Sequence, residues 1–189
     1  TFGVYGRAVG LSDLFCGRLS FLVMEAIYPA LTKIQPGANE CRRVNALVLR
    51  CVAWIVIPIC IVLAVTAGPV VVFLYGEKWL EAIPLIPWTM ASGAVGAISH
   101  SVYMLLLANQ REKRCFLADL LVLIGTCLSL GLLLPSGVRA YLFGVIITQV
   151  LAVVLLLLWL HRQQAFTLTG ITNAIAQPII GGAAALLIC

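Results

Sequence analysis

Charged side chains are scarce in this sequence. Asp, Glu, Lys and Arg together make up 10% of its 189 residues, whereas hydrophobic residues make up 62%. A soluble globular domain averages about 25% charged and about 45–50% apolar residues. The few charged residues stand in short patches between long uncharged runs, as expected when only the loops contact water. The composition therefore argues against a soluble domain and indicates an integral membrane protein.

Catalytic signatures are also missing. The chain has only two aspartates, Asp13 and Asp119, so it lacks the DDxxD cluster with which membrane prenyltransferases hold magnesium. It contains no glycine-rich phosphate loop, no HExxH and no GxSxG sequence. Its seven cysteines are scattered without a CxxC or zinc spacing, and we assign them no chemistry. We therefore expect a protein that is not an enzyme, with no catalytic residues, no cofactor and no metal site.

Long uncharged runs are what the sequence does have. A bilayer core of about 30 Å requires about 20 helical residues at 1.5 Å each. Five uncharged runs occupy residues 51–75, 82–110, 120–138, 140–160 and 163–189. Each of them has about 20 residues or more. A β-barrel would show strands of about 10 residues with alternating polarity. Residues 150–159 do not alternate, so a barrel is rejected.

The runs predict an all-α fold, a polytopic transmembrane helix bundle in a single domain over residues 1–189. We expect its helices at about residues 11–33, 44–75, 84–109, 115–134, 140–160 and 172–189, the last one incomplete. The chain begins at Thr1 and stops at Cys189 inside an apolar run. We therefore expect it to be a fragment of a longer protein.

The distribution of basic residues between the loops predicts the orientation of the helices. Successive loops with their flanks carry four, one, three, one and one Lys or Arg residues. Cytoplasmic loops are enriched in Lys and Arg. We therefore expect the loops near Lys33–Arg43, Arg111–Arg114 and His161–Arg162 to face the cytoplasm, and the first helix to begin outside.

The same topology explains the net charge of +5. The basic loops are also placed to contact the anionic headgroups of membrane lipids, which we count among the partners. The sequence shows no basic stripe with interleaved aromatic residues, which a nucleic-acid surface would need. We expect no nucleic-acid partner.

The first expected helix is the least apolar one, with Asp13, Arg18 and Glu25 inside it. Arg18 and Glu25 are seven residues apart and so share a helix face. A charge near the middle of a membrane costs about 2.5–3.5 kcal/mol even on the lenient insertion scale, and therefore faces a water-filled cavity or a partner. One interpretation is that this helix lines a substrate path, with Arg18 attracting an anionic group. The other is an ion pair with another helix that only fixes packing.

Two further polar residues have simpler interpretations. Asp119 follows Arg111, Lys113 and Arg114, so pairing with this basic loop is favoured over proton or cation coupling. His100 ends a segment of small residues that allows close helix packing. We interpret it as a hydrogen-bonded packing residue rather than a ligand.

Several short motifs resemble one known family. The sequence Phe-Leu-Tyr-Gly-Glu-Lys-Trp at residues 73–79 is similar to the Gly-Glu-Lys-Trp loop of bacterial polysaccharide flippases, which belong to the multidrug, oligosaccharidyl-lipid and polysaccharide exporter superfamily. Val-Tyr-Gly-Arg-Ala at residues 4–8 resembles the Tyr-x-Arg-Ala sequence early in the C-terminal half of that family. Tyr-Pro-Ala-Leu at 28–31 and Leu-Leu-Leu-Ala at 105–108 resemble further helix ends. The resemblance covers nearly the whole chain but only about half of a complete flippase.

The resemblance implies one incomplete lobe of a two-lobe flippase like the multidrug exporters, whose N-terminal lobe is the missing partner. Such proteins flip undecaprenyl-pyrophosphate-linked oligosaccharides across the inner membrane by alternating access, for lipopolysaccharide, capsule or exopolysaccharide. The resemblance implies that Arg18 and Arg7 would bind the anionic pyrophosphate in the cavity. One alternative is a related exporter of cationic drugs, which would use acidic cavity residues. Others are a polysaccharide polymerase or ligase, for which no loop is long enough, and a purely structural membrane subunit.

Overall fold

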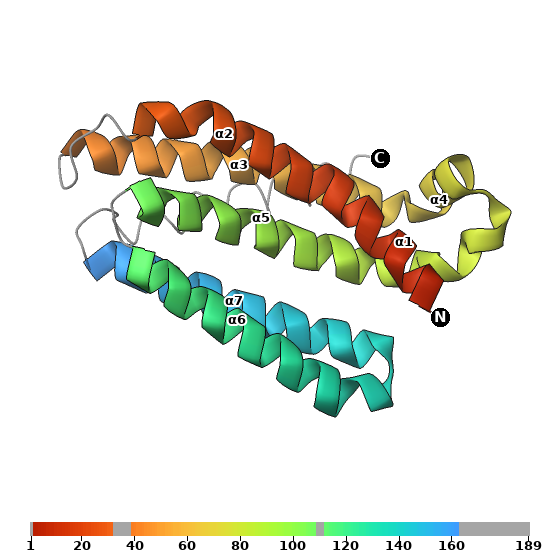
Figure 1. Ribbon diagram of the computed structural model, residues 1–189. Helices are drawn as coiled ribbons and strands as arrows, with labels where there is room; N and C mark the ends of the chain where they lie inside the picture. The colour runs from red at the N-terminus through yellow and green to blue at the C-terminus, as the bar shows by residue number, and fades with distance from the viewer. Residues whose placement is uncertain (1, 32–38, 109–111, 163–189) are drawn as a thin grey trace.

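The computed structural model describes residues 2–31, 39–108 and 112–162 and shows a bundle of long helices (Figure 1). In chain order the elements are α1 (Phe2–Ser12), a π-helical turn (Asp13–Gly17), α2 (Arg18–Leu31), α3 (Asn39–Val65), α4 (Ala67–Tyr75), a 3-10 helix (Glu77–Leu85), α5 (Ile86–Ala108), α6 (Glu112–Leu133), a short 3-10 turn (Leu134–Ser136) and α7 (Val138–Arg162). None of these residues forms a strand. The predicted all-α fold is confirmed, and the helix expected at 172–189 lies outside the described residues.

Four helical segments are long and apolar enough to cross a membrane. They are Arg43–Val65, Glu77–Ala108, Glu112–Ser136 and Val138–Trp159. The last three correspond to the helices expected at 84–109, 115–134 and 140–160. The first of them starts seven residues early because it includes the 3-10 helix, and the other two start three and two residues early. These segments confirm the predicted polytopic helix bundle.

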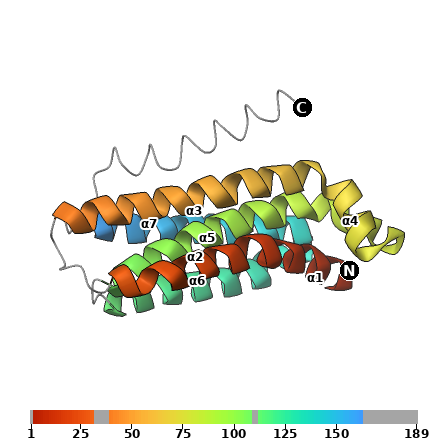
Figure 2. The same cartoon turned by 90° about the horizontal axis from the view of Figure 1, so that it is seen from above.

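The first helical segment differs from the other four. It starts at Phe2 instead of residue 11, and the π-helical turn divides it into α1 and α2. It is not among the four segments that length and hydropathy alone identify as spans. Its role as a membrane span therefore stays a prediction, although it lies along the same bundle (Figures 1 and 2).

The single helix expected over residues 44–75 is wrong, because the chain breaks at Thr66. The backbone of Thr66 has φ −89° and ψ 20°, and its hydroxyl donates a 2.7 Å hydrogen bond to the carbonyl of Val62. Pro69 has no N–H to donate to the carbonyl of Val65, and its ring would clash with that carbonyl in a continuous helix. A new helix, α4, therefore starts at Ala67 and leaves the direction of α3 (Figure 1). Hydropathy alone gives no sign of this break.

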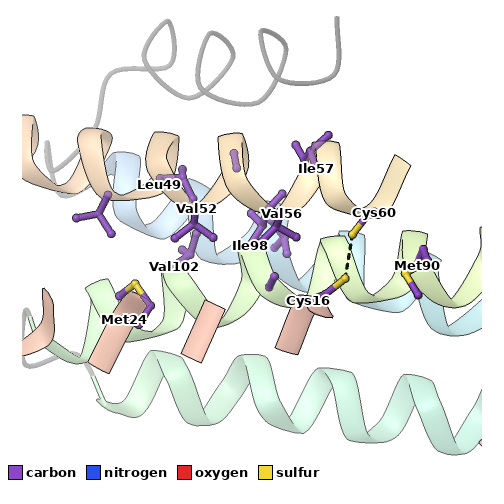
Figure 3. Close-up of a cluster of buried hydrophobic side chains, with 14 of the residues drawn as sticks. Cys16, Met24, Leu49, Val52, Val56, Ile57, Cys60, Met90, Ile98 and Val102 are labelled. Atoms are coloured by element: carbon purple, nitrogen blue, oxygen red, sulfur yellow. Dashed lines mark hydrogen bonds between the residues drawn. The ribbon is translucent and has the colours of Figure 1, made fainter. Parts of the chain in front are cut away.

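Helix α5 is the centre of the bundle. It contacts α1, α2 and α3 on one side and α6 and α7 on the other. Buried aliphatic side chains fill the space between α3 and α5, among them Val52, Val56, Ile98 and Val102 (Figure 3). The core therefore joins the first helical segment, α3 and α5 into one layer, and the α6–α7 pair packs onto the opposite side of α5.

Helix α1 is fixed to α5 by hydrogen bonds as well as by packing. The Ser12 hydroxyl donates to the carbonyl of Thr89 at 2.8 Å. The Thr89 hydroxyl is shared between the carbonyl of Ile86 at 3.0 Å, in its own helix, and that of Ala8 at 3.2 Å, in α1. Both side chains are buried. A Cβ added at Gly93 would collide with Ser12 Oγ, so the glycine is what allows this close approach. The position of the π-helical turn on α5 follows from these contacts.

Candidate functional site: a polar groove in an apolar bundle

A groove of about 690 Å³ lies between the first helical segment, α5 and α7. Its polar lining comes from all three elements: Tyr5, Ser12, Asp13, Arg18, Ser20, Thr89, Ser92, His100 and Gln149. A cluster of this size is unusual in a chain with so few charged residues, since an unsatisfied polar group costs several kcal/mol in hydrocarbon. The groove is therefore where the polar side chains of an otherwise apolar bundle gather.

Two of the predicted site residues, Asp13 and Arg18, line this groove together. Both side chains are exposed in the isolated chain. They bracket the π-helical turn, which inserts an extra residue into the helix; such turns are frequent at functional sites. Within the part of the chain that the structure describes, no acidic partner lies within 4.0 Å of Arg18. Both interpretations of Arg18, a substrate path and an ion pair with another helix, therefore stay predictions.

Glu25, the third predicted residue, lies in an adjoining groove of about 470 Å³. The lining of this second groove is mostly apolar, with Met24, Tyr28, Met104 and Leu107 among its residues. Phe21 and His100 line both grooves, so the polar groove continues directly into the apolar one.

His100 marks the junction of the two grooves. Its ring stacks on Phe21 with centroids 6.1 Å apart and an angle of 29° between the planes. Its Nε2 atom is buried and has no hydrogen-bond partner within residues 2–31, 39–108 and 112–162. The predicted packing role of His100 is therefore seen in its contact with Phe21. The predicted hydrogen bond is not seen at Nε2 within the described residues.

Arg7, the fourth predicted residue, is not brought together with Arg18. Its guanidinium lies 5.4 Å from the ring centroid of Tyr75 and 5.1 Å from that of Trp79. Such cation–π contacts are worth about 0.5–2 kcal/mol each. The contacts tie α1 to the Gly-Glu-Lys-Trp loop, so the two sequence motifs meet at the end of the bundle that carries α4. This arrangement gives Arg7 a structural role outside the groove.

Gln149 is one of the groove residues that the sequence did not single out. It accepts a 2.9 Å hydrogen bond at Oε1 from the Ser92 hydroxyl, which links α7 to α5 along the groove. A signal was present, because Gln149 is the only amide side chain in the uncharged run 140–160. A buried or lipid-facing amide needs a partner, and the groove supplies one.

The helices and the groove define a multi-pass membrane protein with a polar path along an otherwise apolar bundle. Residues 1–84 match the model of a family described as polysaccharide biosynthesis protein. A curated relative from Klebsiella pneumoniae, described as an uncharacterized membrane protein in the cps region, is 27% identical over 96 residues. That alignment covers 51% of this chain and 20% of the relative's own length. No solved structure matches the chain.

These matches confirm the resemblance to polysaccharide biosynthesis proteins that the motifs indicated. The matched residues include Asp13 and Arg18 of the groove, together with Arg7 and its partners Tyr75 and Trp79. The walls that α5 and α7 contribute to the groove lie beyond residue 84.

Proposed function

We propose that the protein flips an undecaprenyl-pyrophosphate-linked oligosaccharide across the bacterial inner membrane, for lipopolysaccharide, capsule or exopolysaccharide biosynthesis. The observation that carries the proposal is the polar groove, whose wall holds an arginine without an acidic partner in the described chain. The match of residues 1–84 to polysaccharide biosynthesis proteins points to a glycan as the cargo.

The chemistry of the groove suits a lipid with an anionic head. The Arg18 guanidinium presents a fork of donors that fits phosphate oxygens in a bidentate arrangement. Ser92, Gln149 and Asp13 supply hydroxyl, amide and carboxylate groups that exchange hydrogen bonds with sugar hydroxyls. The apolar groove beside Glu25 can contact the part of the lipid's hydrocarbon chain that adjoins its anionic head. In this proposal the charged head of the lipid stays in contact with the polar side chains of the groove while it crosses the membrane.

The membrane topology belongs to the same proposal. The end of α2, both ends of the α5–α6 connection and the end of α7 lie at one end of the bundle, where Arg43, Lys113 and Arg114 also stand (Figure 1). We assign this end to the cytoplasm, as the basic loops predict. In this proposal an N-terminal lobe of the same protein faces the groove and alternates its access between the two sides.

Flipping makes and breaks no covalent bond, so the proposal requires no catalytic residue. The second candidate, export of cationic drugs, draws on Asp13, which places a carboxylate in the same groove. The two candidates differ in the charge of the cargo, and a transport assay separates them.

The test is translocation by the protein, together with its N-terminal lobe, reconstituted in lipid vesicles. A fluorescent short-chain lipid diphosphate carrying an oligosaccharide is placed in both leaflets, and a quencher added outside reports the inner fraction. We expect protein-dependent exchange between leaflets, with the lipid recovered chemically unchanged. A polymerase or ligase would lengthen or transfer the glycan, and a drug exporter would move a cationic dye but not the lipid. Either result would overturn the proposal.

A further inference from the structure

Two cysteines that are 44 positions apart in the sequence meet inside the bundle. The sulfur of Cys16, in the π-helical turn, lies 2.9 Å from the sulfur of Cys60, in α3 (Figure 3). Cys16 has 0% of its surface exposed and Cys60 has 5%. Among the described cysteines these two are the only ones that form a hydrogen bond with each other. Because the two cysteines are so far apart in the sequence, their spacing did not indicate that they form a pair.

We infer that Cys16 and Cys60 form a modification site, a dithiol that peroxide converts into a disulfide. A disulfide has a sulfur–sulfur distance of about 2.05 Å, so the two atoms need to approach by roughly 0.9 Å. The two side chains already point toward each other (Figure 3).

The chemistry proceeds in two balanced steps with hydrogen peroxide as the oxidant. One cysteine loses its proton and attacks the peroxide as a thiolate; the oxygen–oxygen bond breaks, the sulfur keeps an OH group as a sulfenic acid, and the hydroxide that leaves takes up the proton as water. The second thiol then attacks the sulfenic sulfur, the sulfur–sulfur bond forms, and a second water leaves. The two cysteines lose two hydrogen atoms in total, and the peroxide is reduced to two water molecules. Because the second thiol is already in contact, it intercepts the sulfenic acid before further oxidation.

The position of the pair gives the bond a mechanical consequence. Asp13 and Gly17, on either side of Cys16 in the turn, line the polar groove. Cys60 lies two residues after Pro58 in α3, a helix that is packed on the centre of the bundle. A Cys16–Cys60 bond therefore holds the groove wall against α3. Closure of such a long loop also restricts the unfolded chain, so the oxidised protein unfolds at a higher temperature than the reduced one.

The experiment counts thiols in a protein that keeps only this pair. Every other cysteine is replaced by alanine, and membranes containing the protein are treated with hydrogen peroxide. The protein is then denatured in sodium dodecyl sulfate, which exposes the buried thiols, and labelled with a maleimide polymer. We expect two labels per chain before oxidation, none after it, and two again after reduction. The intact mass should fall by two hydrogen atoms.

A matched control keeps Cys16 and Cys115 instead, two buried thiols that do not contact each other; the Cys115 thiol lies against the carbonyl of Tyr103. This control should gain oxygen atoms or stay unchanged under the same treatment, without losing two hydrogen atoms. The inference fails if the Cys16–Cys60 protein keeps both labels after peroxide, if it gains oxygen atoms instead of losing hydrogen, or if the control loses hydrogen equally. A Cys16→Ser variant should lose the oxidation-dependent rise in unfolding temperature.

Discussion

Replacing Arg18 with alanine is expected to reduce glycan export by roughly tenfold to a hundredfold or more, with the protein level in the membrane unchanged. A hydrogen bond to a charged group contributes about 1.5–3 kcal/mol, and each 1.4 kcal/mol changes an equilibrium tenfold. Arg18 lines the groove and is exposed there, so its removal opens no cavity in the packed core. The measurement is surface polysaccharide in cells that depend on the variant, with the protein quantified in the same membranes.

Two further variants make this result specific to the guanidinium in the groove. Arg18→Lys keeps the charge but loses the bidentate fork, so it should retain part of the export. Arg50→Ala removes an exposed arginine of α3 that does not line the groove, and it should export normally. Normal export by Arg18→Ala, or an equal loss in Arg50→Ala, would contradict the role of Arg18.

Replacing Gly93 with valine is expected to disrupt the packing of the first helical segment on α5. Even a Cβ at this position meets the sulfur and Cβ of Cys16 at 3.2 Å, besides colliding with Ser12 Oγ. Overpacking of this kind costs about 1–3 kcal/mol or more, and the displaced Ser12 also loses its hydrogen bond to Thr89. We expect a lower unfolding temperature in detergent and a smaller yield of correctly inserted protein.

The matched control is Gly96→Ala, on the same helix. A Cβ at Gly96 meets no atom within 4 Å, so this variant should unfold at the temperature of the unmodified protein. Equal unfolding temperatures for the Gly93 and Gly96 variants would show that α1 does not pack on α5 as described.

Hydropathy was sufficient to predict the positions of α5, α6 and α7. The uncharged runs placed α5, α6 and α7 within a few residues, because the cost of charge in hydrocarbon limits where each span can end. The same rule could not find the break at Thr66, since Pro69 lies in a run that is apolar on both sides. A helix end set by backbone geometry inside an apolar run leaves no trace in the distribution of charges.

Part of the candidate site was predictable, because a charged residue inside an expected membrane span indicates a functional position. Asp13 and Arg18 were found in this way, and the structure places both in the groove. The partners of Arg7 and the Cys16–Cys60 contact depend on which helices are neighbours and how each is rotated. These are long-range properties of the bundle, and the spacing of residues along one helix does not contain them.

The most direct test of the account is whether the lipid-linked glycan occupies the groove. A photoreactive amino acid is placed at Val145, which lines the groove on α7, or at Leu151 of the same helix, which is 57% exposed and outside the groove. After illumination in membranes with a radiolabelled lipid-diphosphate oligosaccharide, the account predicts a sugar-bearing adduct at Val145 that unlabelled substrate competes away, and little at Leu151. Equal labelling at the two positions, or labelling at Val145 that unlabelled substrate does not reduce, would contradict it.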